Sequence, residues 1–259
     1  MEVIIRPSKK SVTDLAASII ADYVKRKPTL NMGLATGRTM EELYSKIAAM
    51  DLNFTFCKSF NLDEYIGIKP TDKNSYRYYM NKHFFDKINI NIKNTFLLDG
   101  MAKDTVEACR IYESLIKDNG GIDLQLLGIG RTAHIGFNEP LSALRSRTRE
   151  KALAPITFAQ NSPLFDNPED MPKRALTMGV GTILEAKRIL MIVTGAEKAK
   201  ILAKAVEGPI TSMISATALQ LHPACTVIVD EEAAEELTEK EYYSWIFKNE
   251  PEWEPYRTV

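Results

Sequence analysis

Cysteine and histidine are scarce in this chain, whose 259 residues include three of each. The cysteines are odd in number, widely separated and without Cys-x-x-Cys spacing, which argues against a disulfide framework and a zinc site. Each lies in an apolar or amphipathic stretch, so we expect buried, reduced thiols at Cys57, Cys109 and Cys225.

Long hydrophobic runs and an excess of one charge are also missing. The N-terminal residues have no continuous apolar segment of the signal-peptide type, and no run approaches the roughly 18 residues of a membrane span. We therefore expect no membrane partner and, by default, a cytoplasmic location. The 33 basic and 34 acidic residues give a net charge of -1 with no basic cluster, which argues against nucleic-acid binding. A small molecule is the expected partner.

Short apolar runs alternate with amphipathic helical patterns along the chain. Strands are expected at residues 31–35, 54–61, 96–98, 124–128, 189–194 and 226–230. Helices are expected from Ser11 to Pro28 and at residues 39–50, 75–86, 106–117, 198–206 and 231–237. This alternation predicts an α/β fold in a single domain over residues 1–259, with a doubly wound, mainly parallel, Rossmann-like sheet and helices on both faces.

Ligands of such sheets bind at the carboxyl ends of the strands, so the loops that follow the strands are of special interest. The first contains Thr36, Gly37, Arg38 and Thr39 immediately before a predicted helix. Free N–H groups at the helix start, a glycine and two hydroxyls could bind an anion. The alternative is a simple helix cap by Thr39, and the loop by itself does not decide between them.

The second loop places two carboxylates, Asp63 and Glu64, directly after an apolar strand. A carboxylate held at the edge of a sheet and partly desolvated can serve as a general base. The alternative is a solvated turn in which Asp63 caps the next helix.

The third loop, residues 127–140, has the spacing Gly128-x-Gly130 and then presents His134 and Glu139. Its opening matches the dinucleotide pattern G-x-G-x-x-G/A, but that pattern should begin a long helix. Here Gly, Asn-Glu and Pro follow within a few residues of the histidine, which is typical of a loop. We therefore reject a nicotinamide site and expect an imidazole and a carboxylate suited to proton transfer.

Several of these motifs together resemble the glucosamine-6-phosphate deaminase family. They are Asn-Leu-Asp-Glu-Tyr at 61–65, His-Ile-Gly-Phe-Asn-Glu-Pro at 134–140, Ser-Arg-Thr-Arg at 146–149, Thr-Met-Gly-Val-Gly-Thr at 177–182 and Leu-Gln-Leu-His-Pro at 219–223. They occur in the family's order over about nine-tenths of the chain. The Phe-Asn-Glu-Pro ending distinguishes the pattern from 6-phosphogluconolactonases, which share the fold.

The resemblance implies conversion of glucosamine 6-phosphate and water into fructose 6-phosphate and ammonia, without a metal or organic cofactor. By resemblance, His134 opens the sugar ring, Glu139 assists it, and Asp63 removes the proton from C2. The resemblance also implies that residues 36–39 and Lys198 bind the phosphate group.

The chain departs from well-known members of the family at four positions. Thr132 and Ala133 replace an Asp-Gly pair before the histidine, and a side chain at position 133 is strained if the backbone has positive φ. Pro163 stands where a phosphate-binding arginine is usual, while Arg38 stands where a small residue is usual. We hypothesise that Arg38 supplies the guanidinium that Pro163 cannot.

Ser142, Arg149 and Lys151 match positions that bind the activator N-acetylglucosamine 6-phosphate between subunits of hexameric relatives, which implies a homo-oligomer. The alternative for Arg149 is a structural ion pair. Two rival functions also stay open. One is a deaminase, isomerase or lactonase acting on a different sugar phosphate, and the other is a catalytically weak sugar-phosphate sensor.

Overall fold

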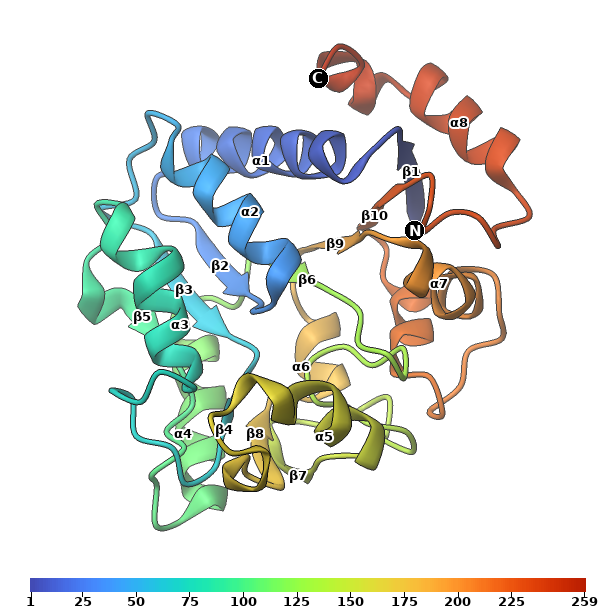
Figure 1. Cartoon of the computed structure of the whole chain (residues 1–259). Coiled ribbons are helices and arrows are strands. Elements are labelled where there is room, and N and C mark those ends of the chain that lie inside the picture. The colour runs from blue at the N-terminus through green and yellow to red at the C-terminus, as the bar shows by residue number, and fades with distance from the viewer.

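A computed structural model describes residues 1–259 and contains a seven-stranded parallel sheet (Figure 1). The strand order is β1-β10-β9-β6-β2-β3-β5. The strands are β1 (Glu2–Arg6), β2 (Asn31–Leu34), β3 (Lys58–Asn61), β5 (Thr95–Phe96), β6 (Leu124–Leu127), β9 (Arg188–Val193) and β10 (Cys225–Asp230). Every residue of β2, β6 and β10 is buried, so the sheet is covered on both faces. The predicted α/β fold is confirmed.

Eight α-helices surround the sheet: α1 (Lys9–Arg26), α2 (Arg38–Ala48), α3 (Tyr76–His83), α4 (Thr105–Asp118), α5 (Pro155–Asn161), α6 (Val180–Leu184), α7 (Ala199–Val206) and α8 (Lys240–Asn249). Short 3₁₀ helices occupy Phe85–Lys87, Ile92–Asn94, Ser162–Leu164, Pro168–Asp170, Ala196–Lys198, Ser215–Leu221 and Pro251–Tyr256. One core of 59 buried residues runs through the sheet and its helices.

Two helix predictions need correction. The start of α1 is earlier than Ser11, because Ser8 is the N-cap and the two serines form a reciprocal capping box. The helix expected at residues 231–237 is absent, and the segment forms turns instead. There the carboxylate of Asp230 accepts the N–H of Ala233 at 2.9 Å, which stabilises a turn.

A second, antiparallel sheet was not predicted. It has the order β4-β8-β7 and consists of β4 (Asp63–Tyr65), β8 (Arg174–Thr177) and β7 (Arg149–Ala152). The strands are short and mixed in composition, so periodicity does not reveal them. A six-residue apolar cluster packs beside this sheet: Tyr65, Ile68, Phe137, Phe165, Met171 and Ala175. Because β4 follows β3 almost directly, the small sheet lies beyond the carboxyl end of β3.

The C-terminal segment packs on the edge strand β1, where α8 lies beside it (Figure 1). Trp253 donates from Nε1 to Glu2 at 3.1 Å, and the hydroxyl of Tyr256 donates to Asp22 at 2.7 Å. The segment therefore covers an edge that would otherwise be open to pairing. None of the helices combines the length and apolar character that crossing a bilayer requires.

Candidate active site

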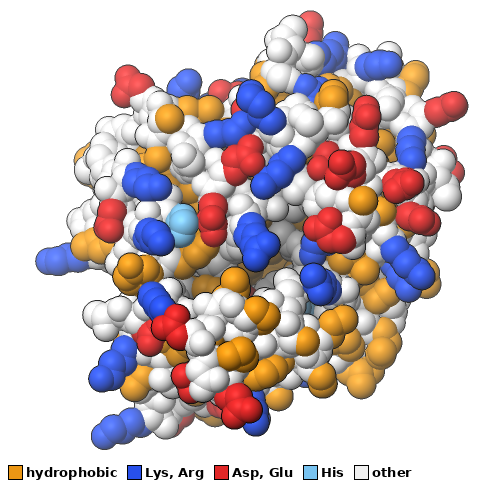
Figure 2. Space-filling view, viewed as in Figure 1, with side chains coloured by type: hydrophobic (Ala, Val, Ile, Leu, Met, Phe, Trp, Pro, Cys, Tyr) orange, Lys and Arg blue, Asp and Glu red, His pale blue; other side chains and the backbone are white.

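The loops singled out in the sequence lie at one edge of the sheet. In the sheet β9, β6, β2 and β3 are neighbours and run parallel, so their carboxyl ends meet. These ends lead to Lys198, His134, the 36–39 loop and Asp63, respectively. The face seen in Figure 2 is hollowed near its middle, between α2 and α5, with Lys and Arg side chains around the hollow.

His134 and Glu139 form a nearly buried pair. His134 Nδ1 lies 2.9 Å from Glu139 Oε2, and the Thr132 hydroxyl lies 2.9 Å from the same nitrogen. Glu139 Oε1 accepts the N–H of Ala154 at 3.1 Å. Burial by itself would raise the pKa of Glu139, but the hydrogen bond and charge of His134, together with Thr157 and Ala154, lower it to about 2. Glu139 is therefore an ionised partner that orients the imidazole.

The backbone before the histidine is tightly constrained. A Cβ on Gly130 would lie 2.0 Å from His134 Nε2, so only glycine permits this position of the ring. Ala133 has φ of +56°, and the expected strain at this position is confirmed.

Asp63 lies on β4 and is 7% exposed. Burial, with a smaller contribution from the charge of Glu64, raises the pKa of Asp63 to about 8. Its Oδ2 lies 3.6 Å from the place where a Cβ on Gly136 would stand, so the carboxylate borders the histidine loop. The interpretation of Asp63 as a solvated helix cap is therefore wrong.

Ser75 is the N-cap of α3, and its hydroxyl accepts the N–H of Tyr78 at 3.0 Å. Glu64 also contributes to this helix start. Its carboxylate accepts the N–H groups of Tyr65, Tyr76 and Arg77 at 2.9 to 3.0 Å, and the latter two begin α3. The two adjacent carboxylates thus have different surroundings, and Asp63 is the one without a hydrogen-bond donor.

The first loop has the geometry of an open helix start. Gly37 is the N-cap of α2 with φ of +121°, and no side chain caps the helix. The hydroxyl of Thr39 lies 3.3 Å from that of Thr194, so the alternative of a simple helix cap by Thr39 is wrong. Thr36 is half-buried, and Arg38 is exposed in the first helical turn. The first N–H groups of α2 lack partners within the helix and are suited to an anion.

Lys198 reaches the same edge from the turn after β9. Its Nζ donates to the carbonyl oxygen of Ile129 at 3.0 Å, in the loop that carries His134. Burial lowers the pKa of this ammonium, with opposing effects from Glu197, which raises it, and Arg131, which lowers it. Pro163 is exposed in a 3₁₀ turn.

Ser142, Arg149 and Lys151 share no hydrogen bond. Ser142 is buried with no partner for its hydroxyl, and Lys151 is half-exposed. Arg149 makes no salt bridge; its Nη1 donates to Asn138 Oδ1 at 2.9 Å. The alternative of a structural ion pair for Arg149 is therefore wrong.

The other histidines have structural contacts. His83 is half-exposed and lies against Tyr79, with ring centres 4.6 Å apart. His222 is buried at the end of a 3₁₀ helix, with Nε2 2.7 Å from the carbonyl oxygen of Ala186. As expected, all three cysteines are buried and unpaired. Nowhere do three His, Cys, Asp or Glu side chains gather as metal ligands.

Three residues near the site were missed in the sequence. The hydroxyl of Tyr79 donates to the carbonyl oxygen of Gly37 at 2.8 Å, and the hydroxyl of Thr177 accepts the N–H of Phe137 at 3.0 Å. Asn138, the third, is fully buried. Thr177 lies in the motif at 177–182 and Asn138 in the motif at 134–140, so the motifs pointed to both residues. Their contacts depend on the small antiparallel sheet, which the sequence did not predict.

Comparison with known proteins identifies the family. A family model described as glucosamine-6-phosphate isomerases/6-phosphogluconolactonase matches residues 8–234. The glucosamine-6-phosphate deaminase of Shewanella loihica is 44% identical over 250 residues, covering 95% of this chain and 93% of that protein. The deaminase of an Arthrobacter species is 43% identical over 258 residues, covering 98% and 99%.

Solved structures agree with this assignment. A structure described as a monomeric glucosamine-6-phosphate deaminase matches with a TM-score of 0.89 and 42% identity, covering 91% of this chain and all of that one. The 6-phosphogluconolactonase of Trypanosoma cruzi shares the fold, with a TM-score of 0.75 at 20% identity over 92% of this chain and 97% of that one. The chain belongs to the glucosamine-6-phosphate isomerase/6-phosphogluconolactonase family.

Proposed function

We propose that the chain converts glucosamine 6-phosphate and water into fructose 6-phosphate and ammonia. The observation that carries the proposal is the juxtaposition of Asp63, whose pKa is raised to about 8, with the loop that presents the His134–Glu139 pair. Deamination with isomerisation needs a base for carbon and an acid–base group for oxygen, and these residues supply the two. The 42 to 44% identity to deaminases over nearly the whole chain supports the same substrate.

Ring opening is the first step. His134 takes the proton of the C1 hydroxyl and delivers a proton to the ring oxygen, so the C1–O5 bond breaks and an aldehyde forms. Glu139 stays ionised, holds Nδ1 at 2.9 Å and stabilises the imidazolium that forms in between.

Proton transfer at carbon follows. Asp63 accepts the C2 proton, the electron pair forms a C1–C2 double bond, and the aldehyde oxygen gains the proton that the substrate ammonium gives up, which leaves an enolamine. Return of a proton to C1 leaves an iminium at C2; water adds there and ammonia leaves, which yields the ketose. The substrate ammonium beside Asp63 favours the ionised carboxylate, and a carboxylate with a raised pKa is a stronger base than an ordinary one.

The phosphate group binds at the start of α2 and at Lys198 in this proposal. Thr36, Gly37 and Thr39 offer hydroxyls and free N–H groups, and Lys198 adds a positive charge. Arg38 replaces the arginine that Pro163 excludes. Arg38→Ala should raise the KM for the sugar phosphate about tenfold or more with little change in kcat. A KM that stays the same refutes the role of Arg38.

The proposed function is tested by incubating the purified chain with glucosamine 6-phosphate and measuring ammonia and fructose 6-phosphate. The matched control is Asp63→Asn, which should lose nearly all turnover, about 10²-fold or more. Galactosamine 6-phosphate and 6-phosphogluconolactone complete the panel. If the chain turns over one of these two compounds but not glucosamine 6-phosphate, its substrate is a different sugar phosphate. If it binds sugar phosphates without turning any of them over, it is a sensor.

We also propose a single domain over residues 1–259, since the small sheet carries a cluster of only six buried residues. Buried free thiols fit a reducing compartment, and we propose the cytoplasm.

A homo-oligomer with an activator site at Ser142, Arg149 and Lys151 rests on the resemblance alone. Light scattering tests it, because a hexamer has six times the 29.1 kDa of one chain. Addition of N-acetylglucosamine 6-phosphate to the assay tests the activator site.

A further inference from the structure

Arg149 occupies an unusual place for a partly buried guanidinium. It lines a groove of about 1050 Å³ between α4, β7 and α6, away from the active-site edge. Its Nη2 is buried without a hydrogen-bond partner, and burial lowers its pKa. A buried charge without an ionic partner is costly, so a contribution to stability does not explain the arrangement.

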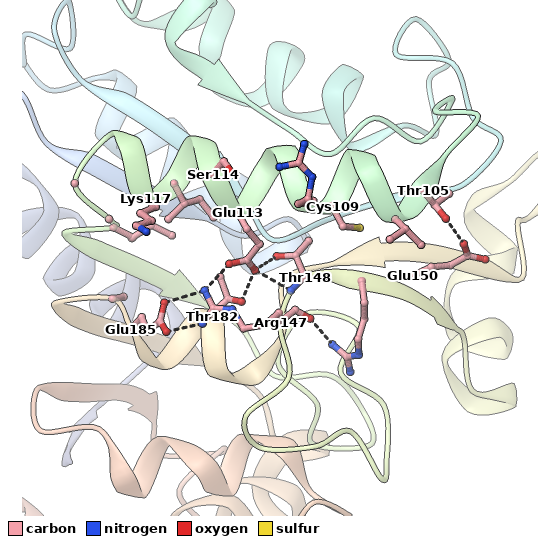
Figure 3. A pocket seen from close by; sticks show the side chains of 18 of the residues that line it. Thr105, Cys109, Glu113, Ser114, Lys117, Arg147, Thr148, Glu150, Thr182 and Glu185 are labelled. Carbon is pink, nitrogen blue, oxygen red and sulfur yellow. Dashed lines mark hydrogen bonds and ion pairs between the residues drawn. The ribbon is translucent and has the colours of Figure 1, made fainter.

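The carboxylates of the groove are all engaged by other residues. Figure 3 shows Glu113 contacting Arg147, Thr148 and Thr182, with hydrogen bonds of 2.5 to 2.8 Å. Glu185 also pairs with Arg147.

The third carboxylate of the groove, Glu150, accepts from Thr105 at 2.7 Å and pairs with Arg174. Arg149 is therefore left with two neutral acceptors: the carbonyl oxygen of Arg147 at 3.3 Å and, at the shorter distance of 2.9 Å, the side-chain amide of Asn138.

Asn138 connects Arg149 to the active-site loop. Its side chain is fully buried, and Nδ2 donates to the carbonyl oxygens of Ile135 at 2.9 Å and Met178 at 2.8 Å. The other side-chain atom, Oδ1, has Arg149 Nη1 as its donor, at 2.9 Å. Asn138 directly precedes Glu139, so the guanidinium completes the contacts of the residue that fixes this turn of the loop.

The small sheet places Arg149 in register with the candidate base. Thr177 on β8 is opposite Asp63 of β4 on one side and opposite Arg149 of β7 on the other. Residues opposite each other in antiparallel strands have side chains on the same face. Thr177 also accepts the N–H of Phe137 at 3.0 Å, so this row of side chains contacts the histidine loop at two points.

We infer that Arg149 is a positioning residue for the reaction, which holds Glu139 against His134 through Asn138. This inference rests on the proposed function. Misplacement of a catalytic group by about 1 Å can cost about 10²-fold in rate, and the residues proposed to bind phosphate, at the start of α2 and at Lys198, make no hydrogen bond to Arg149 or Asn138. Arg149→Met should therefore lower kcat by about 10-fold to 10²-fold while KM changes by less than about threefold.

Arg149→Lys and Arg174→Met are the matched variants. Lysine can still donate to Asn138, so Arg149→Lys should recover part of the lost kcat. Arg174 lines the same groove on the next strand and pairs with Glu150, without touching the loop, so Arg174→Met should keep the kcat of the original chain. Equal losses in Arg149→Met and Arg174→Met would indicate general destabilisation and overturn the inference.

A second readout does not depend on turnover. The chain has three histidines, so ¹⁵N-histidine NMR spectra can resolve each imidazole at one fixed pH. In Arg149→Met the ¹⁵N chemical shifts of His134, whose Nδ1 lies 2.9 Å from Glu139, should change, while those of His83 and His222 should not. Unchanged His134 chemical shifts overturn the inference, even if the original chain releases no ammonia. Absence of ammonia from the original chain refutes the proposed function instead, so the two failures are distinguishable.

Discussion

Replacing Asp63 with asparagine should make the chain more stable at alkaline pH. The pKa of this carboxyl rises from 3.8 to about 8 on folding. The folded state thus favours the protonated carboxyl. The contribution of this group to the free energy of unfolding is fully present below pH 3.8 and is lost as the pH rises through about 8. A shift of about four units at about 1.36 kcal/mol per unit corresponds to a cost of about 5 kcal/mol at pH 9.

Asparagine has nearly the same shape and does not titrate, so Asp63→Asn escapes this cost. Between pH 5 and pH 9 its free energy of unfolding should gain about 4 kcal/mol relative to the original chain. Urea denaturation followed by circular dichroism at several pH values measures the difference. Asp118→Asn, on the exposed end of α4, is the control and should show a constant difference. Parallel stability curves for Asp63→Asn and the original chain would refute the burial argument for a strong base.

Three further outcomes follow from the structure. Ala133→Val should lower the free energy of unfolding by about 2 kcal/mol or more, because a β-branched residue is strained at positive φ. Ala133→Gly should change this free energy by less than about 1 kcal/mol, and thermal unfolding of both variants measures the difference. Burial raises the pKa of all three thiols, to about 11 for Cys109 and about 12 for Cys225. At pH 8 a thiol reagent should therefore modify Cys57, Cys109 and Cys225 only slowly in the folded chain, whereas in urea it should modify all three completely. Asp230→Asn should raise the KM for the sugar phosphate several-fold, because the carboxylate accepts the N–H of Gly195 at 3.0 to 3.1 Å and so holds the turn that leads to Lys198; steady-state kinetics test this.

Local pattern predicted the large sheet well. Continuous apolar runs such as 189–194 indicate buried parallel strands, and the structure has β9 at Arg188–Val193. The helix at 106–117 also agrees, because Thr105–Asp118 is amphipathic and is capped by Asp104. By contrast, β7 and β8 have neither continuous apolar runs nor strict alternation. The strand β8 pairs with β7 on one side and with β4 on the other, across long stretches of sequence, and such pairing leaves no local signal.

The sequence by itself determined six of the seven strands of the large sheet, five of the α-helices, the loops in which the chemistry would lie, and the family, because these depend on local periodicity and on motif spacing. Only the tertiary structure separated Asp63 from Glu64, since burial and hydrogen-bond donors come from α3 and from the histidine loop. It likewise decided the contact of Arg149. The partners of a buried polar side chain come from segments distant in the chain, and packing fixes which of them it meets.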